Sequence, residues 1–246
     1  MIERSIIFLA LLPIWLAAQP EDIVLKAMKD ELHRNLTELH ISDFEKPFFI
    51  GYNVQDIRSL SVAASLGSIV QSSNHHNRLK NVRVLVGSYE FNDESLDANT
   101  GALQEGHEID LPLDDDYYGI RRSLWITTDY VYKSAARQFK KNVQTVEEKK
   151  SKGQDVSHRR FAVGEGVTLV EEIKPFDHDP ARLENLVREL SSLFNQYPDL
   201  MGSGVYLNTS RVINYMVNTE GTSARTTQYI TSVSYTHLTL PTKRIV

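Results

Sequence analysis

Histidine and carboxylate clusters are the residues of this chain that could do chemistry, because histidine nitrogens bind zinc and carboxylate oxygens bind harder cations. The sequence of 246 residues contains 8 histidines and 32 acidic residues. His33 and His40 lie two turns apart on a predicted helix, a separation of about 10 Å that is too long for two ligands of one zinc ion. His75 and His76 are adjacent in a predicted hairpin loop, where an extended backbone would direct them to opposite sides. We interpret all four as solvated histidines.

Three short motifs resemble parts of catalytic or cation sites. The first, His107 to Asp110, begins like a zinc-peptidase signature, but no second histidine follows after four or five residues. The second, Asp114 to Gly119, holds three consecutive carboxylates, which favour hard cations. Adjacent side chains diverge, however, and capping of a helix explains these residues more simply. The third, Phe176 to Pro180, places Asp177 beside His178, but it also has the form of a helix start.

Four tyrosines lie in the longest predicted helix and are interpreted as packing residues with polar tips: Tyr117, Tyr118, Tyr130 and Tyr132. The sequence contains no glycine-rich phosphate loop, nucleophile elbow or spaced pair of activated carboxylates. It therefore predicts no catalytic residue, no cofactor-binding residue and no metal ligand in this chain. One alternative stays open, a self-contained extracytoplasmic enzyme whose site would use His107, Asp177 or His178.

Composition restricts the chemistry further. The chain has no cysteine, which excludes disulfides, thiolate metal sites and lipid attachment through cysteine. The net charge is −5 with acidic and basic residues mixed throughout, so no broad positive surface is available for phosphates and no nucleic-acid partner is expected. A chain of this length buries about 70% of its unfolded surface and can form one large or two small domains on apolar packing alone.

The first residues have the composition of a secretory signal peptide. Arg4 supplies a positive charge, Ile6 to Ala17 is an almost unbroken apolar run, and cleavage is expected near Ala18. The run has about a dozen residues, fewer than the roughly 20 that a membrane span needs. We therefore expect an extracytoplasmic location, periplasmic or secreted, and no membrane partner once the signal is removed.

Apolar residues that recur every three or four positions predict three helices, over residues 21–40, 117–149 and 180–197. Asp116 and Asp179 precede the second and third helices and are predicted to be their N-caps. The second helix also has a partly apolar second face, which predicts burial on more than one side.

Alternating and β-branched stretches predict the strands. A three-stranded meander is expected over 47–57, 60–66 and 82–86, with 72–78 as its second hairpin loop. Two or three further strands are expected over 203–233, with a tight turn at 218–221. Residues 92–116 and 153–175 are predicted to be a surface loop and a weakly ordered connection. The predicted fold is α+β, an antiparallel sheet with long amphipathic helices packed on one face.

Six stretches, taken in order, resemble the amino-terminal region of exported members of the PmbA/TldD family of metallopeptidases. The resemblance covers roughly Glu21 to Val233 and depends on the order and the amino-acid sequences of many segments rather than on one motif. The six stretches are residues 21–39, 45–56, 60–73, 82–93, 117–139 and 204–226.

The resemblance implies a zinc-dependent peptidase of two domains that acts on peptides or partly unfolded chains and commonly forms dimers. It also implies that zinc is bound by a His-Glu-x-x-x-His signature and a later cysteine, carboxy-terminal to the matched region. This chain contains neither group. No metal ligand of the family is therefore carried over to any position here, and zinc is implied only for a full-length parent.

The last residues have an unusual amino-acid sequence. Val233 to Thr242 resembles the translation of a transposon-end sequencing adapter, so we expect the native sequence to stop near Ser232 and the tail to be disordered or arbitrarily placed. The predicted domains are a signal peptide at 1–18, a truncated PmbA/TldD-like amino-terminal domain at 19–232, and an adapter-derived tail at 233–246.

The sequence thus favours the amino-terminal, non-metal-binding domain of a secreted zinc-dependent peptidase, inactive by itself. The alternative is a non-catalytic extracytoplasmic module of the same fold, used for binding or assembly. Expected partners are a peptide or unfolded-protein substrate and a second subunit, identical or related.

Overall fold

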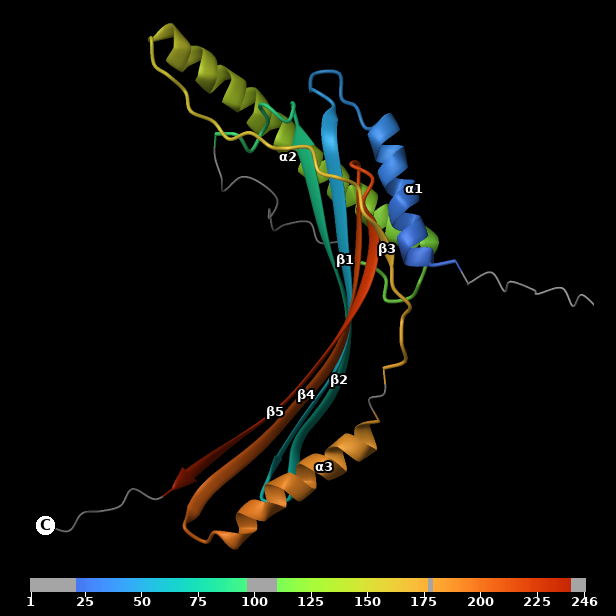
Figure 1. Cartoon of the computed structure of the whole chain (residues 1–246), viewed down its shortest axis with the longest axis vertical. Helices are drawn as coiled ribbons and strands as arrows, with labels where there is room; N and C mark the ends of the chain where they lie inside the picture. The colour runs from blue at the N-terminus through green and yellow to red at the C-terminus, as the bar shows by residue number, and fades with distance from the viewer. Residues whose placement is uncertain (1–20, 97–109, 177–178, 240–246) are drawn as a thin grey trace, which may run out of the picture.

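The computed structural model describes residues 21–96, 110–176 and 179–239. The predicted signal peptide and the candidate residues His107, Asp177 and His178 lie outside these ranges. The described residues form a five-stranded sheet with three α-helices, so the predicted α+β class is confirmed (Figure 1). None of the described helices combines the length and the apolar character of a membrane span.

One long hairpin forms half of the sheet. Strands β1 (Pro47–Ser65) and β2 (Ser68–Val86) have 19 residues each and pair antiparallel along their whole length. Leu66 and Gly67 connect them with φ angles of 49° and 84°, the left-handed conformation of a two-residue hairpin turn. The predicted three-stranded meander is therefore wrong. Residues 72–78 lie inside β2, and they looked like a loop because this part of the strand is polar on both faces.

The second half of the sheet is also a hairpin. Strands β4 (Leu200–Asn218) and β5 (Ser223–Thr239) pair antiparallel, and the predicted turn at 218–221 is confirmed. The short β3 (Thr168–Val170) pairs parallel with β5, which gives the strand order β2-β1-β4-β5-β3. Residues 233–239 of the predicted tail pair with β4 and are not disordered. Their backbone pairing needs no particular side chain, and their side chains up to Leu238 are exposed.

Each helix begins after an aspartate whose carboxylate accepts a backbone N–H, as predicted for Asp116 and Asp179. Helix α2 (Tyr117–Ser151) is long, whereas α1 (Ile23–Glu38) and α3 (Pro180–Ser192) are shorter. A 3-10 turn, Leu193–Gln196, continues α3 to the predicted end of that helix.

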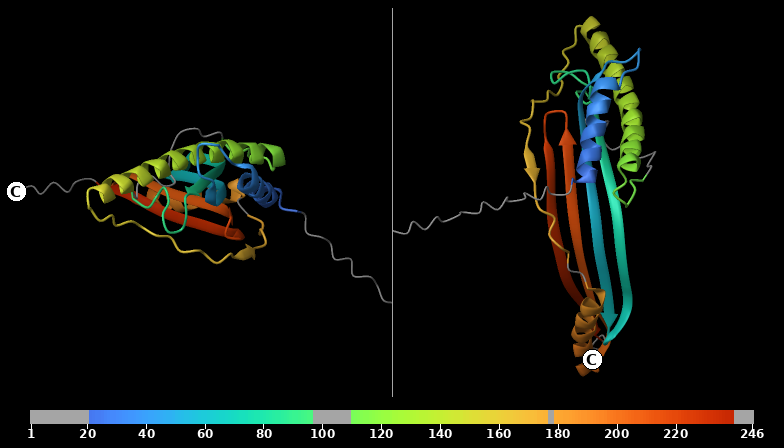
Figure 2. Two further views of the ribbon diagram at one scale, coloured as in Figure 1. Left: turned by 90° about the horizontal axis from the view of Figure 1, so that it is seen from above. Right: turned by 90° about the vertical axis from the view of Figure 1, so that its right-hand side faces the viewer.

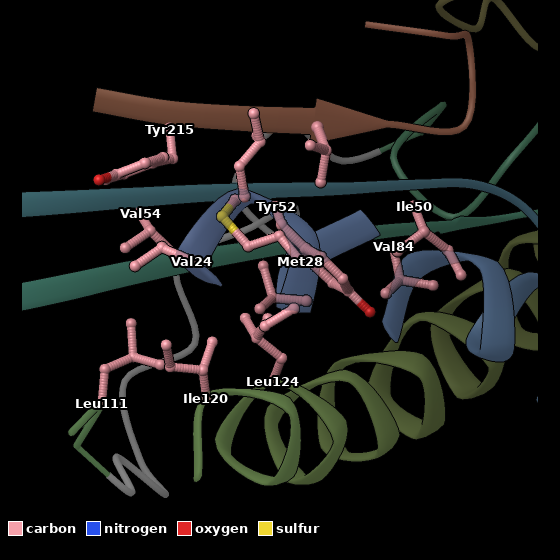
Figure 3. Packing of buried hydrophobic residues seen from close by; sticks show 14 of the residues in the cluster. Val24, Met28, Ile50, Tyr52, Val54, Val84, Leu111, Ile120, Leu124 and Tyr215 are labelled. Atoms are coloured by element: carbon pink, nitrogen blue, oxygen red, sulfur yellow. The ribbon is translucent and has the colours of Figure 1, made fainter. Parts of the chain in front are cut away.

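The main core lies where α1 and α2 cover one end of the sheet. Val24 and Met28 of α1 lie between strand residues such as Tyr52 and helix α2, where Leu124 is fully buried (Figure 3). Arg121 of α2 also donates to the buried carboxylate of Glu31 in α1 at 3.0 Å, which joins the two helices directly.

A smaller core lies at the other end of the sheet, under α3. Leu60 and Val62 of β1, Leu207 of β4 and Val187 of α3 form it. In β1 both cores use even-numbered residues, and because side chains alternate along a strand, both lie on the same face of the sheet. The three helices therefore pack on one face, as predicted, and α1 and α2 are separated from α3 by an uncovered middle section (Figures 1 and 2).

Replacement of Leu124 by alanine should lower the free energy of unfolding by about 2–5 kcal/mol, because it leaves a cavity between α2 and the sheet. Urea denaturation followed by circular dichroism measures this change. Leu36→Ala is the matched control, since Leu36 of α1 is 45% exposed and its loss should cost less than about 0.5 kcal/mol. Equal losses in both variants would contradict the described core.

Candidate functional site

A row of polar side chains crosses the uncovered middle of the helix-bearing face. Arg58 of β1 lies opposite His76 of β2 and opposite Arg211 of β4, and Arg211 lies opposite Tyr229 of β5. Residues directly opposite each other in antiparallel strands direct their side chains to the same face, about 5 Å apart. We call these four residues the central row.

An ion-pair network fixes the β2 end of the central row. The carboxylate of Asp56 accepts hydrogen bonds from Arg78 Nε at 2.9 Å, from Arg78 Nη2 at 2.6 Å and from the His76 ring at 3.1 Å. Arg78 also donates to the carbonyl of Pro112 at 2.8 Å and to the carboxylate of Asp115 at 2.8 Å. The segment before α2 is thereby attached to the middle of the sheet.

Burial and charge pairing act in opposite directions on this network. Burial alone would raise the pKa of Asp56, but hydrogen bonds and charge attraction from His76 and Arg78 outweigh it and hold this pKa below its ordinary value. Burial would likewise lower the pKa of Arg78, and its bonds to Asp56 and Asp115 raise it instead. Asp56 and Arg78 are therefore both charged, and each neutralises the other.

The two arginines at the centre of the row have no such partner. Arg58 is exposed and Arg211 is half-buried, and within the described residues neither makes an ion pair. The Nε atom of Arg211 is buried without a hydrogen-bond partner, as is the hydroxyl of Thr227, which lies diagonally beside it on β5. Like charges directly opposite each other destabilise a sheet, so this arrangement costs stability.

The connection between β3 and α3 closes the β5 end of the row. The hydroxyl of Tyr229 donates to the carbonyl of Lys174 at 2.6 Å, and the ring of Phe176 lies 6.1 Å from the Tyr229 ring. Glu171 accepts the backbone N–H of Thr227 at 2.9 Å. These bonds occupy the Tyr229 hydroxyl and the Glu171 carboxylate, and they leave the arginines accessible from the middle of the face.

The candidate histidines within the described residues lie around α1 and on β2, and they do not form one cluster. His33 and His40 are exposed at α1 and just after it, and His75 is exposed on β2, so the prediction that they are solvated is confirmed. The same prediction is wrong for His76, which is half-buried and bonded to Asp56. Both pairs of histidines were assigned from local spacing alone, and the partner of His76 lies on the neighbouring strand.

The acidic motif divides into two roles. Asp116 caps α2 by accepting the N–H of Gly119 at 2.6 Å, as predicted, whereas Asp115 pairs with Arg78. Among the four tyrosines, Tyr132 is fully buried and donates to the carbonyl of Glu45 at 3.0 Å. Tyr118 is 78% exposed, so its prediction as a packing residue is wrong.

The described residues contain no group of three or more histidine, aspartate or glutamate side chains that could hold a metal ion. A hollow of about 590 Å³ lies between residues 42–45 and the second half of α2, lined by Phe44, Phe139 and Lys140 among others. In the central row, no acidic side chain of the described residues pairs with Arg58 or Arg211. Two guanidinium groups on opposite residues have the donor geometry that binds negatively charged groups.

The face of the sheet opposite the helices has a different character. Over its middle it carries amides and hydroxyls, which include Asn53, Gln55 and Asn214, and Gln55 donates to Asn214 at 2.9 Å. Asn77 of β2 and Asn208 of β4 are exposed on the same side. Nearer the end of β2 the connection after α2 crosses this face, where Arg83 lies 5.5 Å from the Phe161 ring. We use the name open face for the part of this side of the sheet that the connection after α2 does not cross.

One further buried acid lies outside both surfaces. Asp93 follows β2, is 4% exposed and accepts the N–H of Val86 at 2.8 Å. The side-chain amide of Asn142 in α2 donates to the backbone carbonyl of Asp93 at 2.7 Å, and this bond attaches the loop after β2 to the helix. Burial raises the pKa of Asp93 to about 7. Its role is to close the end of β2, and it faces neither the central row nor the open face.

No protein-family model matches the chain, and no curated protein matches it. Solved structures with a similar fold include TldE from Thermococcus kodakarensis, which is 12% identical with a TM-score of 0.45, over 85% of this chain and 38% of that one.

Two proteins described as candidate modulators of DNA gyrase are also similar. The one from Thermotoga maritima is 8% identical with a TM-score of 0.43, over 89% of this chain and 44% of that one. The one from Bacteroides thetaiotaomicron is 8% identical with a TM-score of 0.46, over 85% and 40%. This chain thus spans about two fifths of the length of the three solved structures.

Replacement of Arg78 by methionine should lower the free energy of unfolding at pH 7 by about 3–5 kcal/mol, because Asp56 is left buried with an uncompensated charge. Since the pKa of Asp56 is lowered by folding, its stabilisation is present above the unfolded value of roughly 3.9 and is lost as the pH falls through the folded value. The deficit of the variant should therefore shrink in acid. Urea titrations at several pH values measure it.

Asp115→Asn is the control for this prediction, because the Asp115 side chain is 58% exposed and its pair with Arg78 should contribute less than about 1 kcal/mol. A loss in Asp115→Asn as large as that in Arg78→Met would place the important charge pair at the surface rather than in the sheet.

Replacement of Asp93 by asparagine should stabilise the chain above pH 7. The folded chain keeps this proton up to about pH 7, whereas the unfolded chain releases it near roughly pH 3.9. The folded state binds more protons between these values, so the free energy of unfolding falls as the pH rises through them. Asparagine removes this dependence and can still accept the Val86 N–H. Thermal unfolding at pH 5 and pH 8 tests it, and an advantage confined to pH 5 would contradict the assignment.

Proposed function

We propose that this chain is the amino-terminal, non-metal-binding domain of an exported zinc-dependent peptidase of the PmbA/TldD family. In this role it binds substrate chains and contacts a second subunit, identical or related, while hydrolysis belongs to another domain of the parent protein. The resemblance of six ordered segments supports the family, and the geometry of the sheet supports the binding role.

The residues of this chain do not fit a zinc site of the kind that the family uses. That site needs a thiolate, and the chain has no cysteine. In the described ranges no cluster of three potential ligands exists either. We therefore assign no catalytic step to any residue here, and zinc belongs to the proposed full-length parent.

The open face is the observation that carries the binding role. It is a broad sheet surface with uncharged hydrogen-bonding groups, and on its β2 side it ends at a strand edge without a partner strand among the described residues. Unpaired N–H and C=O groups at such an edge bind extended chains by adding a strand, and this binding depends little on the sequence of the added chain. A peptide or partly unfolded protein has the chemistry that suits this surface.

A non-catalytic binding or assembly module is the second candidate function, because the same open face would serve it equally well. The two differ only in the metal and the hydrolytic domain. Metal content and hydrolysis by the proposed full-length parent therefore decide between them.

We expect this chain by itself to bind unfolded casein but to contain no stoichiometric zinc and to hydrolyse casein no faster than buffer. The proposed full-length parent should contain zinc and hydrolyse casein until a chelator is added. Atomic absorption and release of labelled peptide measure both properties. Zinc-free full-length protein without hydrolysis would favour the second candidate, and stoichiometric metal in this chain would favour a site at His107, Asp177 or His178.

The same casein-binding assay tests the open face directly. Asn77→Glu places a negative charge on this face, at an exposed residue of the edge strand β2 without a side-chain hydrogen bond in the described structure, and should weaken binding of the acidic casein chain several-fold. Gln154→Glu adds the same charge at an exposed position after α2 and should leave binding unchanged. Equal binding by wild type and Asn77→Glu would remove the open face as the binding surface.

A further inference from the structure

The central row contains an unfavourable arrangement that the proposed binding of chains to the open face does not explain. Arg58 and Arg211 are directly opposite each other on β1 and β4, on the helix-bearing side of the sheet. Two arginines whose Cβ atoms lie about 5 Å apart repel each other, and neither has an acidic partner within the described residues. An uncharged pair at these positions would make a more stable sheet.

The nearest acid of the network does not relieve this repulsion. Asp56 precedes Arg58 by two residues on the same face of β1, but its two oxygens are occupied by Arg78 and His76. Because Arg78 neutralises Asp56, the buried acid nearest to the arginines adds little repulsion for a negative group that approaches them. The positive charge at the centre of the row is therefore available to a ligand.

The β5 side of the row contributes unused hydrogen-bonding capacity. The Nε atom of Arg211 and the hydroxyl of Thr227 are both buried and have no partner. A buried donor without an acceptor costs free energy, and an acceptor atom from a ligand would remove that cost. The two groups lie diagonally across β4 and β5 on the same face, so an acceptor group placed between them would satisfy both.

We propose that the central row is a binding site for an oxyanion, a carboxylate or phosphate group held between the guanidinium groups of Arg58 and Arg211. Each guanidinium offers a planar fork of N–H donors that matches the oxygens of such a group. Bound there, the anion cancels the repulsion between the two arginines and accepts from Arg211 Nε. The site lies on the opposite side of the sheet from the open face, and it does not depend on the peptidase assignment.

Calorimetric titration of the whole chain at low ionic strength tests the proposal, with inorganic phosphate and succinate as separate probes. Arg58→Gln and Arg211→Gln should each weaken binding at least about ten-fold, because each loses charge-assisted hydrogen bonds. Arg137→Gln is the matched control: Arg137 is exposed on α2, has no ion pair within the described residues, and its replacement removes the same charge elsewhere. It should bind like wild type.

Stability without ligand separates a binding role from a structural one. In phosphate-free buffer, Arg58→Gln and Arg211→Gln should raise the Tm, because each removes one of two like charges. Tighter binding of phosphate would assign the site to phosphorylated ligands, and tighter binding of succinate would assign it to carboxylates. The proposal is wrong if neither probe binds saturably, if both variants bind like Arg137→Gln, or if both variants lower the Tm in the absence of anion.

Discussion

The unbroken side-chain alternation of β1 and β4 is the constraint on which the rest of the structure depends. The two strands pair without a register shift, from Gly51 opposite Asn218 at one end to Ala64 opposite Val205 at the other. Since a shift of one residue would transfer every side chain to the other face, this register requires the core under α1 and α2 and the core under α3 to share one face. Everything between the two cores must then alternate in step with them, and Arg58 and Arg211 are placed on the helix-bearing face for that reason.

The same constraint explains the network around Asp56. Asp56 occupies a β1 position that continues the core series of Ile50, Tyr52 and Val54, so its carboxylate cannot turn away from the covered face. Removal of such a charge from water costs several kcal/mol, and a close pair with further hydrogen bonds is needed to offset that cost. Arg78, directly opposite on β2, supplies the pair, and its bonds to Pro112 and Asp115 hold the segment that leads into α2. A charge pair in the sheet thereby positions the start of the longest helix.

The sequence predicts those parts of the fold that are determined by neighbours along the chain. The aspartates that cap α2 and α3, the turn at 218–221 and the existence of the three helices are local signals, and the structure confirms them. The middle of β2 was misassigned because Ser72 to Arg78 has polar residues on both faces, so the alternation that marks a strand is absent there. Strand pairing overrides this weak local preference, since the partner β1 presents the core residues Leu60 and Val62 opposite this segment.

The central row could not be predicted for a different physical reason. Arg58 and Arg211 are 153 residues apart in the sequence. They lie opposite each other because the β1–β2 hairpin and the β4–β5 hairpin, which are distant in the sequence, pair in this register. A single sequence shows each arginine only between a serine and a β-branched apolar residue, where it looks like an ordinary solvated side chain. Their separation from the open face follows from the pleat: on β1 the neighbours Ile57 and Ser59 direct their side chains to the opposite side. A substitution at Arg58 therefore alters the charged face while the amides of the open face stay in place, so the two surfaces can be examined separately on one strand.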